Sequence, residues 1–321
     1  MPGFDILAVV IGIIFVYLLL SLLATVVNEW VMMLLNARGR NLRLAIETML
    51  GDVGKDDQLT GAFFAHPMFK KMTVKGQMLR MPSYLNREMF AKIVMDILTN
   101  GKNYRATFSE IEEKITELFP NENSQTRRLL FSFITQTGDS LDRFQREMHH
   151  WYDSVMDRAS GWYQRYVKQI LLYLGFVLSV IFNADSFEMV KQLARNPQAQ
   201  AEILQQASRF LQVASGNIKE RTLETPAEDS LYKSRMDTLQ REMNLLVREA
   251  TQAQALLGMG WSQAKAMTLF SSFSTFGITL LGWFITAIAI SFGAPLWFDL
   301  LKNLVRMRSS VPIKSKEGEA S

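Results

Sequence analysis

Residues 4–27, FDILAVVIGIIFVYLLLSLLATVV, decide the fold class of this chain. The only ionisable residue among them is Asp5, at the start of the stretch. Because about 20 apolar residues in a helix are enough to cross a bilayer core of about 30 Å, we expect a membrane-spanning helix here. A cleaved signal peptide is the competing interpretation. It fits less well, because no basic segment precedes the run, the run is too long and no A-x-A-like site follows it.

A second, shorter apolar run covers residues 169–183. Its length alone would also suit a buried helix of a soluble protein. However, Trp162 and other aromatic residues precede it, interleaved with Arg165 and Lys168, a mixture typical of helix anchors at the headgroup level. We therefore predict a second span. Either local thinning of the bilayer or extension of the helix through residues 184–187 would supply the missing length.

The third apolar run, residues 266–298, carries no charged side chain and is longer than one perpendicular crossing requires. Pro295 has no N–H to donate, so we expect it to interrupt the helix near Gly293. The remaining residues, 297–308, would then lie on the membrane surface as an amphipathic segment.

The basic residues near the ends of these runs predict an orientation. The ends that are rich in Lys and Arg alternate, as three crossings require, while only Lys191 and Lys265 flank the opposite ends. The positive-inside rule therefore places the N-terminus outside, in the periplasm, and the C-terminus in the cytoplasm. The residues on the rich ends are Arg38, Arg40 and Arg43, then Arg158, Arg165 and Lys168, then Lys302, Arg306 and Arg308.

The sequence thus predicts an all-α integral membrane protein with three transmembrane helices, a helical cytoplasmic domain and a helical periplasmic pair. The expected divisions are residues 1–35 (first transmembrane helix with its juxtamembrane extension), 36–165 (cytoplasmic domain), 166–187 (second transmembrane helix), 188–265 (periplasmic region), 266–292 (third transmembrane helix) and 293–321 (interfacial segment and basic cytoplasmic tail).

The cytoplasmic part has the pattern of short helices followed by one long helix. Apolar residues at helical spacing predict a helix over residues 86–98. Ser109 with Glu112 has the spacing of a capping box, and a third helix is expected from Ser124 to the turn at residues 138–140. From there to Asn183 no proline intervenes, which predicts one helix entering the second span, with Gly161 as its weak point.

The periplasmic part is expected to form two helices. Pro197 begins a helix to about Ser215, and Thr225-Pro226-Ala227-Glu228 has the pattern of a helix start. The helix that follows carries an apolar stripe and charged residues on its other faces, so the two can pack as an antiparallel pair. The stripe consists of Leu239, Met243, Leu246, Ala250, Ala253 and Leu257.

Small residues recur at intervals of four and three along the third span and are candidates for helix packing. Small side chains let helix backbones approach closely in lipid, within one protomer or between copies. A pore-lining polar track is the alternative interpretation. The residues are Ser271, Thr275, Thr279, Gly282, Thr286, Ala289 and Gly293, with shorter stripes at Gly175, Ser179 and Asn183 and at Ala8 and Gly12.

Four charged residues near the ends of the spans are candidates for interfacial roles: Glu29, Arg165, Asp185 and Asp299. We expect structural ion pairs at the headgroup boundary, because water and headgroups can solvate these positions cheaply. A proton relay is the alternative.

The remaining composition argues against several kinds of chemistry. The chain has no cysteine, which excludes disulfides and thiolate sites, and only three histidines. Glu147-x-x-His150 has the spacing of half a di-iron site, but the pattern does not recur, and no nucleotide-binding or hydrolase motif is found. We expect no metal, cofactor or catalytic residue. The net charge of +4 arises mainly beside the spans and does not indicate nucleic-acid binding.

Three segments resemble a family of uncharacterised bacterial inner-membrane proteins. They are residues 151–165 (WYDSVMDRASGWYQR, with Asn183-Ala184-Asp185 after it), residues 293–301 (GAPLWFDLL) and residues 38–42 (RGRNL). The resemblance implies a bacterial inner membrane and brings no known activity. The leading hypothesis is a non-enzymatic scaffold that binds the lipid bilayer and either a protein partner or further copies of itself. A subunit of an oligomeric channel or transporter is the alternative, and a membrane-bound hydrolase or transferase ranks below it.

Overall fold

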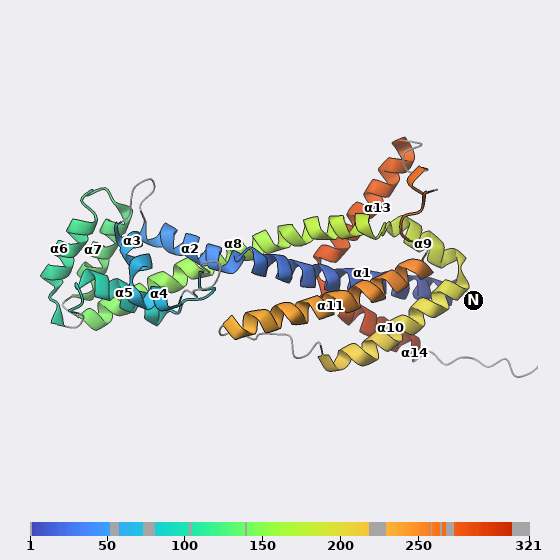
Figure 1. Cartoon of the computed structure of the whole chain (residues 1–321), viewed down its shortest axis with the longest axis horizontal. Helices are drawn as coiled ribbons and strands as arrows, with labels where there is room; N and C mark the ends of the chain where they lie inside the picture. Colours follow the sequence, from blue (N-terminus) through green and yellow to red (C-terminus); the bar gives the residue numbers. More distant parts are fainter. Residues whose placement is uncertain are drawn as a thin grey trace, which may run out of the picture. The chain divides into compact units, whose positions relative to one another are not determined.

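The computed structural model describes residues 2–51, 58–72, 81–102, 105–138, 140–217, 229–257, 259–263, 265–267 and 273–309. Every regular element in these ranges is a helix, as the sequence predicts. The helices are α1 (Pro2–Leu34), α2 (Ala37–Leu50), α3 (Gln58–Ala65), α4 (Pro67–Met72), α5 (Arg87–Leu98), α6 (Phe108–Leu118), α7 (Gln125–Thr137), α8 (Leu141–Ile181), α9 (Ser186–Arg195), α10 (Pro197–Asn217), α11 (Asp229–Leu256), α13 (Phe273–Ser291) and α14 (Ala294–Ser309) (Figure 1).

The chain divides into two compact units. Unit 1 comprises Met1–Trp30 and Val167–Ser321, and unit 2 comprises Val31–Tyr166. The continuous helix α8 contributes its first part to unit 2 and its last part to unit 1. The expected helix from residue 140 to residue 183 is therefore confirmed over Leu141–Ile181, and Gly161 does not interrupt it.

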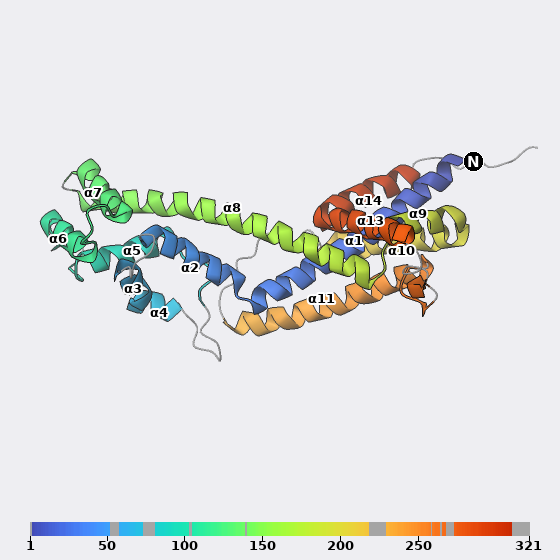
Figure 2. The same ribbon diagram turned by 90° about the horizontal axis from the view of Figure 1, so that it is seen from above.

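Unit 2 is built from α2 to α7 and the beginning of α8, which Figure 2 shows gathered together. Its core contains the fully buried rings of Phe63, Phe90 and Phe144. Tyr152 of α8 stacks near Phe90, with ring centroids 5.0 Å apart, and its hydroxyl donates to the carbonyl of Leu85. The apolar face of each short helix is thus used inside the unit.

Local capping residues set the starts of these short helices. Asn86 caps α5 by accepting from the backbone N–H of Met89 at 2.8 Å, and Ser124 caps α7 in the same way. Both helices lie where the sequence predicts them. The capping box expected at Ser109 is wrong. Thr107 with Glu110 forms it instead, so α6 begins at Phe108. The two spacings are identical, and only Thr107 has the extended backbone that an N-cap needs.

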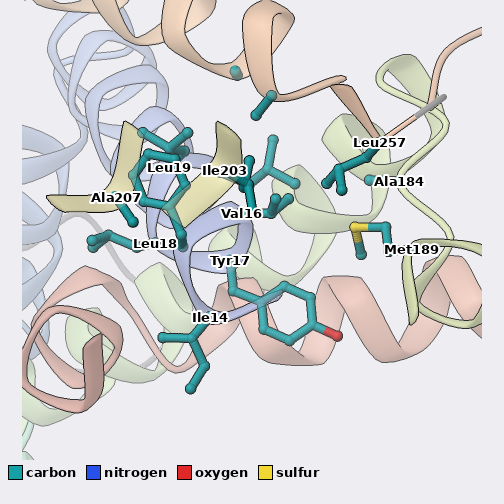
Figure 3. Close-up of a cluster of buried hydrophobic side chains, with 14 of the residues drawn as sticks. Ile14, Val16, Tyr17, Leu18, Leu19, Ala184, Met189, Ile203, Ala207 and Leu257 are labelled. Atoms are coloured by element: carbon teal, nitrogen blue, oxygen red, sulfur yellow. The ribbon is translucent and has the colours of Figure 1, made fainter. Parts of the chain in front are cut away.

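Unit 1 has α1 at its centre. Phe15, Leu18 and Ala24 are completely buried, and α1 packs against residues of α9, α10, α11 and α14. Figure 3 shows Val16 among Met189 of α9, Ile203 of α10 and Leu257, which directly follows α11. The first helix is therefore the core of this unit.

The expected pair of helices in the periplasmic region is present as α10 and α11, and the predicted stripe of α11 faces inward. The proposed helix start at residues 225–228 lies outside the described residues. The pair does not stand apart from the first helix: the rings of Phe15 and Phe210 lie 5.8 Å apart, edge to face. The sequence pattern did not indicate what the inner face of this pair contacts.

Two helices in the described part of the chain are long and apolar enough to cross a membrane, Ile6–Leu34 and Phe273–Ser291. A third candidate is the pair α8 and α9, which bends by 49° between Ile181 and Ser186. The composition therefore suggests a membrane protein with few spans. Of the two ways considered to supply the missing length of the second span, extension of α8 through residues 184–187 is not found, because α8 ends at Ile181 and α9 begins at Ser186.

Candidate functional site at the α8–α9 junction

The chain leaves α8 through a well-defined C-terminal cap. Asn183 has a left-handed backbone, with φ at +45°, a conformation that asparagine adopts more readily than most residues. Its N–H donates to the carbonyl of Val180 at 3.0 Å, and the N–H of Ala184 donates to Ser179 at 2.7 Å. This is the hydrogen-bond pattern of a Schellman motif, which satisfies carbonyls at the end of a helix.

The next helix begins at once. Asp185 is the N-cap of α9, and its Oδ1 accepts from the backbone N–H groups of Phe187 at 2.8 Å and Glu188 at 3.5 Å. An aspartate at this position satisfies two donors that otherwise have no partner within the helix. Four consecutive residues, from Asn183 to Ser186, therefore both end α8 and begin α9.

A chain of three hydroxyl groups joins this junction to α1 and α13. Tyr17 Oη lies 2.8 Å from Ser186 Oγ, which lies 2.7 Å from Thr286 Oγ1. Thr286 Oγ1 lies 2.6 Å from the carbonyl oxygen of Ala184 and 3.0 Å from that of Gly282. A carbonyl oxygen can only accept, so Thr286 is the donor in both contacts.

Because each hydroxyl has one hydrogen, these contacts fix which hydroxyl donates and which accepts along the row of three. The single hydrogen of Thr286 points at the carbonyls, so Thr286 accepts from Ser186. The hydrogen of Ser186 is then in use, so Ser186 accepts from Tyr17. All three side chains are buried. The row of hydroxyls ends at carbonyl oxygens, which take up no proton. It is therefore suited to holding helices together and not to relaying protons.

Helix α13 lies directly against the junction. Trp283 Nε1 donates to Asn183 Oδ1 at 3.1 Å. Gly282 faces the carboxylate of Asp185 so closely that a methyl group added to Gly282 would overlap Asp185 Oδ1. The approach of these two helices therefore depends on a residue without a side chain.

The end of α11 and the segment that follows it also contact the junction. Trp261 Nε1 donates to the carbonyl of Val180 at 2.8 Å, and Asn183 Nδ2 donates to the carbonyl of Gly260 at 3.0 Å. Gln254 Nε2 donates to Phe182 at 3.3 Å. Side chains from other segments thus satisfy the polar backbone groups at this break between helices, as irregular backbone would require within a membrane.

The small residues singled out in the third span fall into two groups. The later part of the stripe is buried within the protomer, at Gly282, Thr286 and Ala289, while Gly293 is half-buried with φ at +87°. In the earlier part, Thr275 is exposed and Thr279 is half-buried. Ser271 lies outside the described residues.

The two shorter stripes also make close contacts. A methyl group added to Gly175 of α8 would lie 3.0 Å from the carbonyl of Ala287, and one added to Gly12 of α1 would lie 2.9 Å from Leu193. Ser179 is completely buried, and Ala8 is 4% exposed. These residues thus serve packing inside unit 1, and α8 and α13 run antiparallel where they meet.

The four charged candidates lie in different surroundings. Asp185 caps α9 and is 8% exposed, which differs from the expected ion pair at the headgroup boundary. Glu29 is half-buried, and Arg165 and Asp299 are exposed. No group of three or more His, Cys, Asp or Glu side chains suited to a metal ion occurs among the described residues.

Sequence reasoning missed Tyr17 and Ser186, the first two hydroxyls of the chain. A signal for Tyr17 was present. Tyr17, Ser21, Thr25 and Asn28 recur at intervals of four and three along α1, which puts them on one helical face. Ser21 Oγ on that face donates to the carbonyl of Ile290 at 3.3 Å. Polar residues on one face of an apolar helix indicate the side that contacts protein.

No protein-family model matches this chain, and no curated protein and no solved structure is significantly similar to it. The resemblance to bacterial membrane proteins noted from the sequence therefore stays a prediction.

Proposed function

We propose that this chain is a non-enzymatic scaffold of a bacterial inner membrane, in which the spans of unit 1 cross the bilayer and unit 2 binds a protein partner in the cytoplasm. The proposal includes three crossings, with the α8–α9 pair as the second. It places the N-terminus in the periplasm and the C-terminus in the cytoplasm, as the basic residues at alternate ends of the spans favour.

The observation that carries the proposal is that α8 is one helix of 41 residues with each end packed in a different unit. Phe144 and Met148 are completely buried in the core of unit 2. Leu178 belongs to the core of unit 1, and Gly175 touches α13. A continuous helix fixed at both ends is suited to connecting a membrane unit mechanically to a binding unit.

Binding can be tested by photo-crosslinking in native membranes. Leu44 on α2 is 57% exposed and Tyr84 is 65% exposed, so each can be replaced by a photoreactive phenylalanine without disturbing the core. We expect a discrete protein adduct from at least one of these two positions. The same photoreactive probe at Leu44 can be placed in a variant carrying Gly161→Pro. Because proline breaks or kinks a helix, comparing the adducts of the two proteins tests the mechanical link through α8. Recovery of neither a partner nor a second copy of the chain would contradict the scaffold.

The orientation can be tested separately, because the chain has no cysteine and single cysteines can be added directly. Glu122 in unit 2 and Gln252 on α11 are exposed and suit this purpose. The nearby Ser124 is a poorer position for a labelled cysteine because it is only 3% exposed. We expect a membrane-impermeant maleimide to label the cysteine at position 252 in intact cells. The cysteine at position 122 should react only after permeabilisation, and the opposite pattern would overturn the orientation.

An oligomeric channel or transporter is the second candidate, favoured by the break between α8 and α9. Interrupted helices with polar groups often mark solute sites in transporters. Ion flux in liposomes that contain the purified protein would support this function. Thr279 is the better position for a blocking bulky residue, because Thr286 is buried and hydrogen-bonded, so enlarging it would disturb folding. A membrane-bound hydrolase or transferase has no residue in its favour.

A further inference from the structure

The most apolar helix of unit 1 is also the most enclosed. In the apolar window of α1, 72% of the residues are buried, against 33% for the window of α13. Tyr17 contacts Trp297 of α14 with ring centroids 5.0 Å apart, and Gly12 lies against Leu193 and Ile203. A helix that is apolar on all sides is either a membrane span or a buried core helix, and composition does not distinguish them.

Helices α8, α9 and α13 of unit 1 expose many apolar side chains. On α13, Ile278, Leu281 and Phe284 are 60%, 54% and 51% exposed. Neither α13 nor residues 169–181 of α8 contain an ionisable group other than tyrosine. We call this surface the apolar face. It consists of the exposed residues Tyr173, Val177 and Ile181 of α8, Phe187 and Val190 of α9, and Phe273, Ile278, Leu280, Leu281, Phe284, Ile285 and Ile288 of α13.

A shallow groove crosses the apolar face where α9 meets α13. Gly277 is one of the residues that line it, and nothing lies within 4 Å of a methyl group added there. Its volume is about 440 Å³, and its lining is almost entirely apolar. The lining residues are Phe187, Phe273, Ser274, Gly277, Ile278 and Leu281.

The exposed surface of α11 is polar by contrast. In the part of α11 whose side chains the structure describes, residues 236–256, Asp237, Arg241, Asn244 and Arg248 are exposed. The exposed large apolar residues there are Leu245, at 61%, and Val247, at 39%. A charged residue at the centre of a membrane helix is costly to insert. This helical surface is therefore unsuited to lipid, although it covers the most apolar helix of the unit.

We propose that the acyl chains of the bilayer contact unit 1 through the apolar face, and that residues 11–24 of α1 form an enclosed core segment without lipid contact. The inference rests on the proposed residence of unit 1 in a membrane. The 19 residues of α13 extend about 28 Å, which matches the hydrocarbon thickness of about 30 Å. Lys168 is exposed just before the apolar part of α8, where its charge complements a lipid phosphate.

Lipid contact can be mapped on the unmodified full chain. The protein is placed in vesicles of phosphatidylcholine and phosphatidylglycerol that contain a phospholipid with a diazirine on its acyl chain. After irradiation, we expect lipid adducts on peptides from residues 273–291 and 169–181, and none from residues 11–24 of α1. Adducts on those α1 residues would overturn the proposal, and so would crosslinks between copies that leave α13 without lipid adducts.

A matched pair of substitutions provides a second readout. Leu281 on the apolar face and Leu245 on α11 are 54% and 61% exposed, so arginine disturbs little packing at either position. In bicelles, Leu281→Arg should lower the ratio of folded to unfolded protein about a hundredfold, and Leu245→Arg less than threefold. Equal losses would refute the assignment. Neither measurement involves a protein partner, so failure of the scaffold proposal would leave this result unaffected.

Discussion

Replacing Thr286 by valine tests the hydroxyl chain at the α8–α9 junction. Valine keeps the shape of threonine and removes one hydroxyl, which leaves the Ser186 hydroxyl without an acceptor and the Ala184 carbonyl without that donor. A buried polar group that loses its partner costs about 1–3 kcal/mol, whereas polar contacts between helices in a bilayer average about 0.6 kcal/mol. Thr286 is completely buried, so we expect unfolding to become easier by about 2 kcal/mol.

The direction of donation along the row of hydroxyls predicts a smaller loss of stability when the hydroxyl of Tyr17 is removed. Tyr17→Phe removes only a donor to Ser186 and leaves the remaining two hydroxyls paired, so about 0.5–1 kcal/mol is expected. Both variants can be compared with Thr279→Val, the same change at a half-buried position of α13, by reversible unfolding in bicelles. A larger effect for Tyr17→Phe than for Thr286→Val would refute the direction. An effect of Thr286→Val no larger than that of Thr279→Val would refute the contribution of the chain.

Three further predictions follow from local geometry. Gly282→Ala should destabilise the protein by about 2 kcal/mol, because the methyl group displaces the carboxylate that caps α9, whereas Gly277→Ala should have little effect; equal unfolding midpoints would disprove this. Asn183→Ala should cost about 1 kcal/mol more than Asn183→Gly in the same assay, because only alanine is strained at positive φ. The hydrogen bond from Lys102 at 2.5 Å, with further help from a backbone N–H, lowers the pKa of Glu110. The stabilisation that ionised Glu110 gives is complete above the ordinary glutamate pKa of about 4.3 and is lost as the pH falls through the lower pKa of the folded state. A carboxyl NMR titration in which Lys102→Gln left the pKa of Glu110 unchanged would contradict this cause.

The elements that the sequence predicts well are those set by residues close in the chain. Asn86 and Ser124 cap the helices that follow them, and α8 continues unbroken from Leu141 to Ile181 through residues that include no proline. The interruption near Gly293 follows from the adjacent Pro295, and α14 begins directly afterwards. In each case the deciding interaction joins residues fewer than five positions apart, so the sequence contains it.

The break between α8 and α9 depends on more distant residues. Asn183 is compatible with a helix end, but its side chain is held by Gly260 and Trp283, which lie 77 and 100 residues away. Asp185 was expected at a membrane boundary because it follows an apolar run. It is found against Gly282, whose missing side chain makes room for it. No spacing rule within residues 169–187 reveals these partners.

The position of α1 shows why composition alone misleads about membrane contact. The hydrocarbon of a bilayer and the interior of a helical bundle are both apolar, so both select the same residues. The positions of the few polar residues are more informative. Tyr17 and Ser21 are one turn apart on one face of α1, and both donate to atoms of other helices. A helix surrounded by lipid would gain nothing from polar side chains aligned in this way, whereas an enclosed helix can use them to fix its rotation. On this argument, α13, whose exposed side chains from Gly277 to Ile288 are apolar, is suited to contact lipid as proposed, and α1 is suited to organise the helices around it.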